Sequence, residues 1–269
     1  MKKVVMSLLI VCLLGVFVFS AWQLIGTLSE YHKGEQAYAD LEQFISVPET
    51  VPRATTPVKA TAPEAEETEP TQEPTMPEEN PFPEVDFEAL KAINPDVVGW
   101  IYIPDTKVNY PIVQGKDNDQ YLKRLITGEY NSSGSIFLDA EVPRDFSGRN
   151  SIIYGHRMNN GSMFADIVKY KEQEFYDTHS TVMLLTPEGN YFVHLFSAYI
   201  TDAWGDSWTI SFVDETFDMW LQARQEASCF ASDVVPSVTD KVLTLSTCTY
   251  ETQDGRFVVH GILEKYPYS

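Results

Sequence analysis

Residues 241–263 read KVLTLSTCTYETQDGRFVVHGIL, a pattern that predicts two β-strands joined by a polar loop. The first strand covers 241–247, where apolar and polar side chains alternate as they do on a pleated strand. The second strand covers 256–263. If the two strands form a hairpin, the loop places Cys248 directly opposite Arg256, with Cβ atoms about 5 Å apart.

A cysteine, an arginine and a histidine form the candidate reactive centre. A guanidinium at Arg256 would lie near any carbonyl that the Cys248 thiol attacks, where it could stabilise developing negative charge. His156 follows the predicted strand 151–154 and would supply the base or cation that a reactive thiol needs. Each residue also has a structural interpretation: a buried small apolar cysteine, a structural histidine and an edge charge. On residue types alone, a cysteine enzyme and a non-enzymatic surface module both remain open.

The C-terminal part of the chain, residues 85–269, predicts one mainly β domain. Short runs rich in β-branched and aromatic residues alternate there with turn residues. The candidate strands are Gly99–Ile103, Asn109–Val113, Ser135–Asp139, Ser151–Tyr154, Thr181–Leu185, Tyr191–Ile200, Lys241–Thr247 and Arg256–Leu263. Eight strands at this spacing favour a closed or nearly closed barrel over a parallel sheet. A helix is predicted at 87–93, before Asn94-Pro95, and a long helical insert at 214–231, before the last two strands.

Residues 1–29 predict a single transmembrane helix that anchors the chain. No charged side chain occurs from Val4 to Ser29, and at about 1.5 Å per residue this run crosses a hydrocarbon core of about 30 Å. Two lysines precede the run and Glu30 follows it, so the positive-inside rule places the N-terminus in the cytoplasm and the remainder outside the cell. The alternative is a signal peptide cleaved after Ser20; the length of the run favours a retained anchor.

Two segments connect the anchor to the β domain. Residues 30–46 have helical spacing and predict a membrane-proximal helix that extends the anchor. Residues 47–84 hold nine prolines and nine glutamates, with no aromatic residue before Phe82. Such a composition cannot bury enough apolar surface to offset its ordering entropy. The interpretation is an acidic Pro-rich stalk, which in polyproline II conformation would span up to roughly 100 Å.

The overall composition excludes some classes of function. The chain carries 39 acidic and 19 basic residues, a formal charge of −20, and a phosphate backbone attracts basic surfaces instead. We therefore expect no nucleic-acid partner. Three cysteines are too few for a disulfide framework, and no Cys/His spacing typical of zinc occurs. We expect neither a metal nor a cofactor.

Several motifs resemble one enzyme family. The TLSTC run at 244–248 resembles the signature of sortases, the cysteine transpeptidases that anchor proteins to Gram-positive cell walls. YGH at 154–156 and GRF at 255–257 resemble the family's histidine and arginine positions, in the right order. Other segments are similar to class B sortases, and the resemblance extends from Phe87 to Lys265. They are 93–101, 109–114, 134–139 and 156–164.

The resemblance implies an eight-stranded sortase β-barrel and a two-step reaction. Cys248 would cleave a C-terminal sorting signal after threonine and hold the protein as a thioester, with His156 as acid and base and Arg256 on the developing oxyanion. The implied partners are surface proteins that carry a sorting signal, the membrane, and an amine of the peptidoglycan precursor lipid II. Ser246, on the same strand face as Cys248, would hydrogen-bond substrate backbone or serve the strand locally. Tyr154 would contribute to substrate binding or pack beside His156.

Two alternatives lie close to this interpretation. A pilus polymerase of the same family would accept a pilin lysine in place of the cell-wall amine. A hydrolytic cysteine peptidase would use the same cysteine and histidine but transfer the acyl group to water. The remaining histidines, His32, His179, His194 and His260, are expected to be structural, and Cys229 is expected to pack the insert helix.

Overall fold

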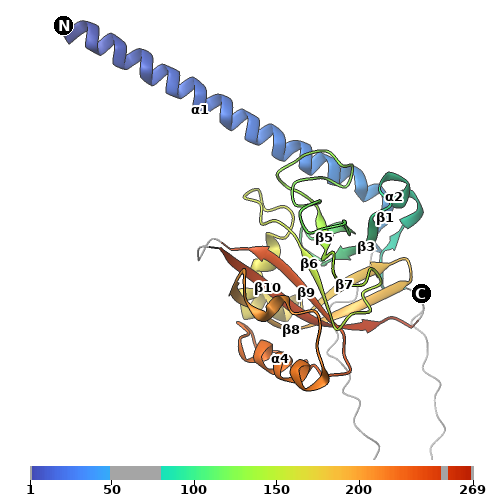
Figure 1. The fold of residues 1–269 in the computed structure, drawn as a ribbon. Coiled ribbons are helices and arrows are strands. Elements are labelled where there is room, and N and C mark those ends of the chain that lie inside the picture. Colours follow the sequence, from blue (N-terminus) through green and yellow to red (C-terminus); the bar gives the residue numbers. More distant parts are fainter. Residues whose placement is uncertain (1, 49–79, 250–253, 268–269) are drawn as a thin grey trace, which may run out of the picture.

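An eight-stranded closed barrel forms the centre of the computed structural model, which describes residues 2–48, 80–249 and 254–267 (Figure 1). Its strands are β3 (Val97–Tyr102), β4 (Asn109–Val113), β5 (Ile136–Leu138), β6 (Asn150–Tyr154), β7 (Thr181–Thr186), β8 (Gly189–Asp202), β9 (Val242–Cys248) and β10 (Gly255–Lys265). Around the barrel the order is β10-β8-β7-β3-β4-β5-β6-β9. All eight predicted strands and the predicted barrel are confirmed.

Two parallel pairings determine which strand ends meet. β6 runs parallel to β9, with Tyr154 beside Ser246, and β4 runs parallel to β5. The other neighbouring strands of the barrel are antiparallel. Because parallel neighbours end at the same edge of a sheet, the residues after β6 and the last residue of β9 lie together. The barrel core lies beneath this edge and contains fully buried Trp100, Ile112 and Phe257.

A single long helix precedes the barrel. Helix α1 runs without a break from Lys2 to Ala39, followed by the short 3-10 helix η1 (Asp40–Phe44). By length and composition it could cross a membrane, and its apolar N-terminal part extends away from the rest of the protein (Figure 1). The predicted anchor and the predicted membrane-proximal helix therefore form one continuous element. Its C-terminal part is packed on the barrel domain, where Tyr38 and Leu41 are buried.

The two ends of the Pro-rich segment lie side by side. Strand β1 (Ile45–Ser46) pairs antiparallel with β2 (Glu84–Val85), and the Asp86 N–H donates to the Phe44 carbonyl over 2.9 Å. Phe82, at the end of the segment, is 1% exposed. The interpretation of 47–84 as an extended spacer between helix and barrel is therefore wrong for its described ends, although residues 49–79 lie outside the described residues. The amino-acid composition of the segment indicated that its middle is polar. The apolar residues that flank it, such as Phe82, determine where its two ends lie.

Three further helices flank the barrel. Helix α2 (Phe87–Ile93) matches the prediction: Asp86 caps its N-terminus by accepting from the Ala89 N–H over 2.9 Å, and it ends before Pro95. Helix α3 (Gln173–Thr178) follows β6 and the 3-10 helix η2 (Asp166–Lys171).

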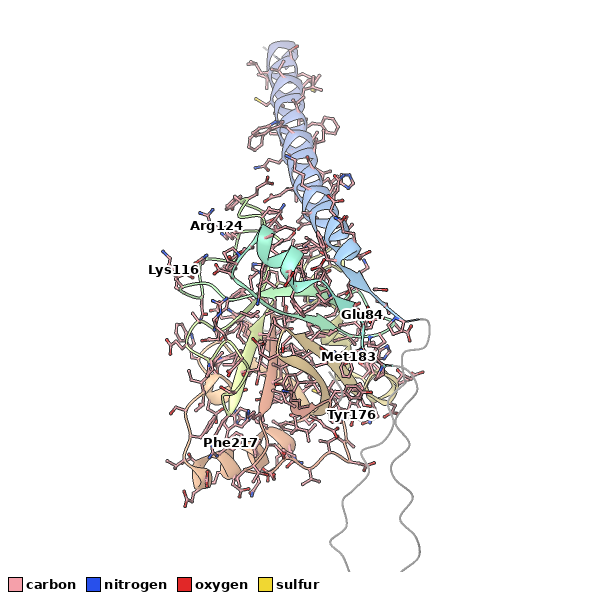
Figure 2. The ribbon with its side chains drawn as sticks, turned by 90° about the vertical axis from the view of Figure 1, so that its right-hand side faces the viewer. Glu84, Lys116, Arg124, Tyr176, Met183 and Phe217 are labelled. Carbon is pink, nitrogen blue, oxygen red and sulfur yellow. The ribbon has the colours of Figure 1, made fainter. Side chains whose placement is uncertain are left out.

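The insert before the last two strands contains the 3-10 helix η3 (Asp206–Trp208) and helix α4 (Asp214–Glu226). Helix α4 ends five residues before the predicted limit of 231. Its Phe217 lies at the opposite end of the molecule from α1 (Figure 2), and it packs in an apolar cluster with Phe196 of β8. The expectation that Cys229 packs this helix is wrong, because Cys229 lies beyond the helix end and is exposed.

Candidate active site

The barrel brings the three predicted reactive residues to one edge. Cys248 is the last residue of β9, and the β9–β10 register pairs it directly with Arg256. The predicted hairpin geometry is thus confirmed. His156 comes two residues after the end of β6, the strand that runs parallel to β9 on its other side. Cys248, His156 and Arg256 are all partly exposed at this edge.

These residues line one pocket. It has a volume of about 290 Å³, and all five residues predicted from the sequence contribute to its wall. The predicted five are Tyr154, His156, Ser246, Cys248 and Arg256. The sequence analysis did not single out the other contributors, which include Asn118, Leu122, Phe137, Ala203 and Trp208. No local pattern distinguishes Asn118 and Leu122, because they lie in the long connection between β4 and β5.

The imidazole of His156 is held through one nitrogen. Its Nε2 lies 2.7 Å from the main-chain carbonyl oxygen of Leu122. A carbonyl oxygen can only accept, so Nε2 carries a hydrogen and donates it. In the neutral ring the other nitrogen, Nδ1, then holds the lone pair. Nδ1 is therefore the atom of His156 that can take up a proton in this pocket.

The glycine before the histidine is required by packing. A Cβ atom on Gly155 would lie 2.5 Å from Cδ1 of Ile136 and 2.7 Å from the ring of Phe164. Its N–H donates to the Ser246 carbonyl over 3.0 Å and so continues the β6–β9 ladder one residue past the strand. This contact places His156 next to β9.

Arg256 is oriented by its own turn. Its Nη1 donates to the carbonyl oxygens of Asp254 and Gly255, at 3.1 and 3.2 Å. A guanidinium carries five N–H donors in a rigid fork and stays charged at any physiological pH. It can therefore offer further hydrogen bonds to a carbonyl or oxyanion beside Cys248.

Tyr154 belongs to a hydrogen-bonded group in the wall of the pocket. Its hydroxyl donates to Oδ2 of the buried Asp139 over 2.9 Å, and Nδ2 of Asn118 donates to the same oxygen over 2.8 Å. Burial, followed by the charge of Asp139, raises the pKa of Tyr154. Tyr154 therefore stays protonated as a neutral donor. Its ring also packs on Phe137, with centroids 5.2 Å apart.

Ser246 contributes both to the pocket wall and to the β6–β9 ladder. It is 2% exposed, lies in the pocket wall, and its carbonyl accepts from the Gly155 N–H. Strand alternation puts its side chain on the same face as Cys248.

Within the described part of the chain, no group of three or more His, Cys, Asp or Glu side chains could hold a metal ion.

The comparison with known families decides the identity of the fold. The sequence matches the sortase domain family over residues 101–264. The chain belongs to the sortase family. The chain is therefore a cysteine transpeptidase.

Individual relatives specify class B. Sortase B of Listeria monocytogenes is 41% identical over 179 residues, which cover 65% of this chain and 72% of that protein. The crystal structure of Staphylococcus aureus sortase B has a TM-score of 0.64 at 36% identity, and the match covers 67% of this chain and 87% of that one. Bacillus anthracis sortase B in complex with AAEK1 has a TM-score of 0.69 at 32% identity, with coverage of 89% and 100%. The chain is therefore a class B sortase.

Proposed function

We propose that this sortase cleaves a C-terminal sorting signal after threonine and joins the protein to an amine of the cell-wall precursor. The observation that carries the proposal is the shared pocket of Cys248, His156 and Arg256, with the cysteine and arginine paired across the β9–β10 ladder. Staphylococcus aureus sortase B has been solved as a substrate complex, and a sortase B has been solved with triglycine, a peptide that carries a free amine. These complexes support a peptide donor and an amine acceptor.

In the first step, Nδ1 of His156 takes the proton of the Cys248 thiol, and the resulting thiolate attacks the carbonyl carbon of the threonine. Negative charge develops on the carbonyl oxygen, where the Arg256 guanidinium stabilises it. The carbon–nitrogen bond then breaks, and the leaving amine takes a proton from His156. The products are a thioester on Cys248 and the released C-terminal peptide.

In the second step, the acceptor amine attacks the thioester carbonyl. His156 takes the amine proton on Nδ1, the nitrogen that does not donate to Leu122. The carbon–sulfur bond breaks, an amide forms, and the Cys248 thiolate is regenerated. Ser246 and Tyr154 complete the wall against which the substrate backbone lies, with Ser246 offering its hydroxyl to that backbone.

The position of the barrel relative to α1 favours a membrane-bound acceptor. Residues 30–38, from the first charge after the apolar run to the buried Tyr38, rise by only about 12 Å along α1. We propose a single-pass topology with the N-terminus in the cytoplasm, residues 1–29 as the anchor and the catalytic domain outside the cell. A barrel held this close to the membrane suits the amine of lipid II better than a lysine on a distant pilin.

The test uses the full chain in detergent micelles, with a panel of threonine-containing sorting peptides. Each reaction runs with and without an amine: triglycine, a diaminopimelate-like amine, or a lysine peptide, and products are read by mass spectrometry. Cys248→Ala should abolish the adduct, whereas Cys229→Ala, which removes an exposed thiol outside the pocket, should not.

The outcomes separate the candidate reactions. A thioester on Cys248 that becomes an amine-ligated product supports the proposal, and the preferred amine distinguishes a wall precursor from a pilin lysine. Release of free acid alone, with every amine present, would identify a hydrolytic peptidase. Product formation by Cys248→Ala would refute the proposed nucleophile.

A further inference from the structure

The carbonyl that holds His156 belongs to the long connection between β4 and β5, residues 114–135. This connection folds back on itself, because the Ser135 N–H donates to the Tyr121 carbonyl over 3.0 Å. Gly134, with φ +58°, lies directly against the Leu122 carbonyl: a Cβ atom there would be 2.5 Å from that oxygen. The position of residues 134–135 therefore determines where the Leu122 carbonyl, and with it the His156 ring, can lie.

Helix α1 contacts this connection at the point where it folds back. The hydroxyl of Tyr38, which is 7% exposed, donates to the Gly134 carbonyl over 2.6 Å. One turn earlier, Gly34 approaches so closely that a Cβ atom would lie 2.9 Å from Oγ of Ser133. Tyr38 is thus linked to His156 through two residues of one loop, Gly134 and Leu122.

Glu30 of α1 makes a second contact with the same loop, near the start of the part of the helix that packs on the barrel domain. The Ser132 N–H donates to Oε1 of Glu30 over 2.8 Å, and Nδ2 of Asn131 donates to the Glu30 carbonyl over 3.0 Å. Arg124, on the same connection, lies at the end of the molecule from which α1 extends (Figure 2). Helix and loop are therefore joined over two turns of α1.

A separate branch reaches the segment that begins with His156 itself. Nδ2 of Asn160 donates to Oε1 of Glu35 over 2.9 Å. Asn160 lies in the turn 156–164. A hydrogen bond from the Phe164 N–H to the His156 carbonyl, 2.9 Å long, joins the two ends of this turn. Helix α1 thus holds both the main chain that carries His156 and the carbonyl that orients its ring.

We propose that Glu30, Glu35 and Tyr38 of α1 together act as a positioning element for His156, so that the helix leading to the membrane supports catalysis through these three residues. Through the Leu122 carbonyl, the element fixes the hydrogen on Nε2 and so leaves Nδ1 as the nitrogen that exchanges the proton. Tyr38 and Glu35 are positioning residues, because neither lines the pocket. The inference rests on the proposed acid–base role of His156.

The test uses the full chain in detergent micelles and removes one polar side-chain group at a time. Tyr38→Phe deletes the hydroxyl that contacts the Gly134 carbonyl and Oγ of Ser135, and it keeps the ring, which packs edge-on against Tyr110 at 5.3 Å. Tyr31→Phe is the matched control: it lies on the same helix, and among the described residues its hydroxyl has no hydrogen-bond partner. Glu35→Ala deletes the second branch at an exposed position, and Glu35→Gln keeps an oxygen acceptor for Asn160.

Two readouts are measured on every variant. One is the pH profile of Cys248 alkylation by iodoacetamide, which needs no sorting peptide. The other is kcat and KM for amine transfer. Tyr38→Phe and Glu35→Ala should each lower kcat by roughly threefold to tenfold at unchanged KM, because a misplaced acid–base group loses rate without losing substrate. Both should also change the alkylation profile, whereas Tyr31→Phe and Glu35→Gln should match the unmodified protein.

Other results would contradict the inference. Wild-type kcat and alkylation profiles in both Tyr38→Phe and Glu35→Ala would overturn the inference. So would a loss of kcat that equals the loss of folded protein in thermal unfolding. His156→Ala is measured first: if it leaves alkylation and transfer unchanged, the proposed role of His156 has failed, independently of the helix.

Discussion

Arg256 faces Cys248 across the antiparallel β9–β10 ladder, although a seven-residue loop separates them in the sequence. Cross-strand neighbours of this kind have Cβ atoms about 5 Å apart. A carbonyl attacked by the thiol therefore lies within reach of the guanidinium, and both groups come from strands whose positions are fixed by the closed barrel. Rigid strands hold such a pair more precisely than loops would.

Arg256→Ala should lower kcat for amine transfer by about 10²- to 10³-fold, since a donor aimed at a developing oxyanion is worth about 3–4 kcal/mol. Arg256→Lys keeps the charge but not the planar fork and should recover only part of the rate. Steady-state kinetics with a sorting peptide and triglycine measures both. Arg144→Ala, at an exposed arginine that donates to the Pro95 carbonyl, is the control. A wild-type kcat in Arg256→Ala would contradict the oxyanion role.

Tyr154→Phe should lower the free energy of unfolding by about 1–3 kcal/mol, because it leaves the buried Asp139 carboxylate without one of its donors. Denaturant unfolding of the variant measures this loss. Tyr130→Phe, at a tyrosine that is 70% exposed, should change stability little. If both variants are equally stable, the Tyr154–Asp139 bond contributes nothing to the fold.

Acidification should destabilise the fold through His260. Burial, together with the charge of Arg224, lowers the pKa of His260 to about 3, and its neutral ring is hydrogen-bonded to the hydroxyls of Tyr199 and Thr244, each at 2.9 Å. The unfolded chain has the ordinary histidine value near 6.5. Between about pH 6.5 and pH 3 the unfolded state thus binds one more proton, and stability falls as pH falls.

The expected contribution is about 1.4 kcal/mol per pH unit inside that window. It is measured as the difference in slope of unfolding free energy against pH between the unmodified chain and His260→Gln. His179→Gln, at a histidine near the surface, should keep the full slope. Parallel slopes in all three proteins would show that His260 titrates alike in both states.

Shortening the Pro-rich segment should leave the fold intact, because its ends are already paired as β1 and β2. Replacing residues 50–78 by a short Gly-Ser linker should raise stability by about 1 kcal/mol, since a shorter loop costs less entropy to close. The melting temperature and the rate of peptide transfer both check this. A large loss of stability would indicate that the removed residues make contacts of their own.

Much of the catalytic edge could be predicted from the sequence. Apolar and polar side chains alternate along β9 and along β10, which predicts two strands. The length of the loop between them sets the register of the hairpin, so the pairing of Cys248 with Arg256 could be predicted from this short stretch of sequence. The TLSTC run and the spacing to His156 indicated the rest of the reactive centre. Asn118, Leu122 and Asp139 could not be predicted, because they reach the pocket or its hydrogen-bonded wall from other parts of the chain.

Local sequence patterns were enough to predict the eight strands, the apolar helix and the three candidate reactive residues, because strand alternation, an uncharged run and a family motif are properties of short segments. The contact of Tyr38 in α1 with Gly134, 96 residues away, and the meeting of the two ends of the Pro-rich segment depend on the complete fold. The first contact joins one hydroxyl to one carbonyl, and the second pairs two residues of β1 with two residues of β2. They leave no periodic pattern in the chain, and only the folded arrangement reveals them.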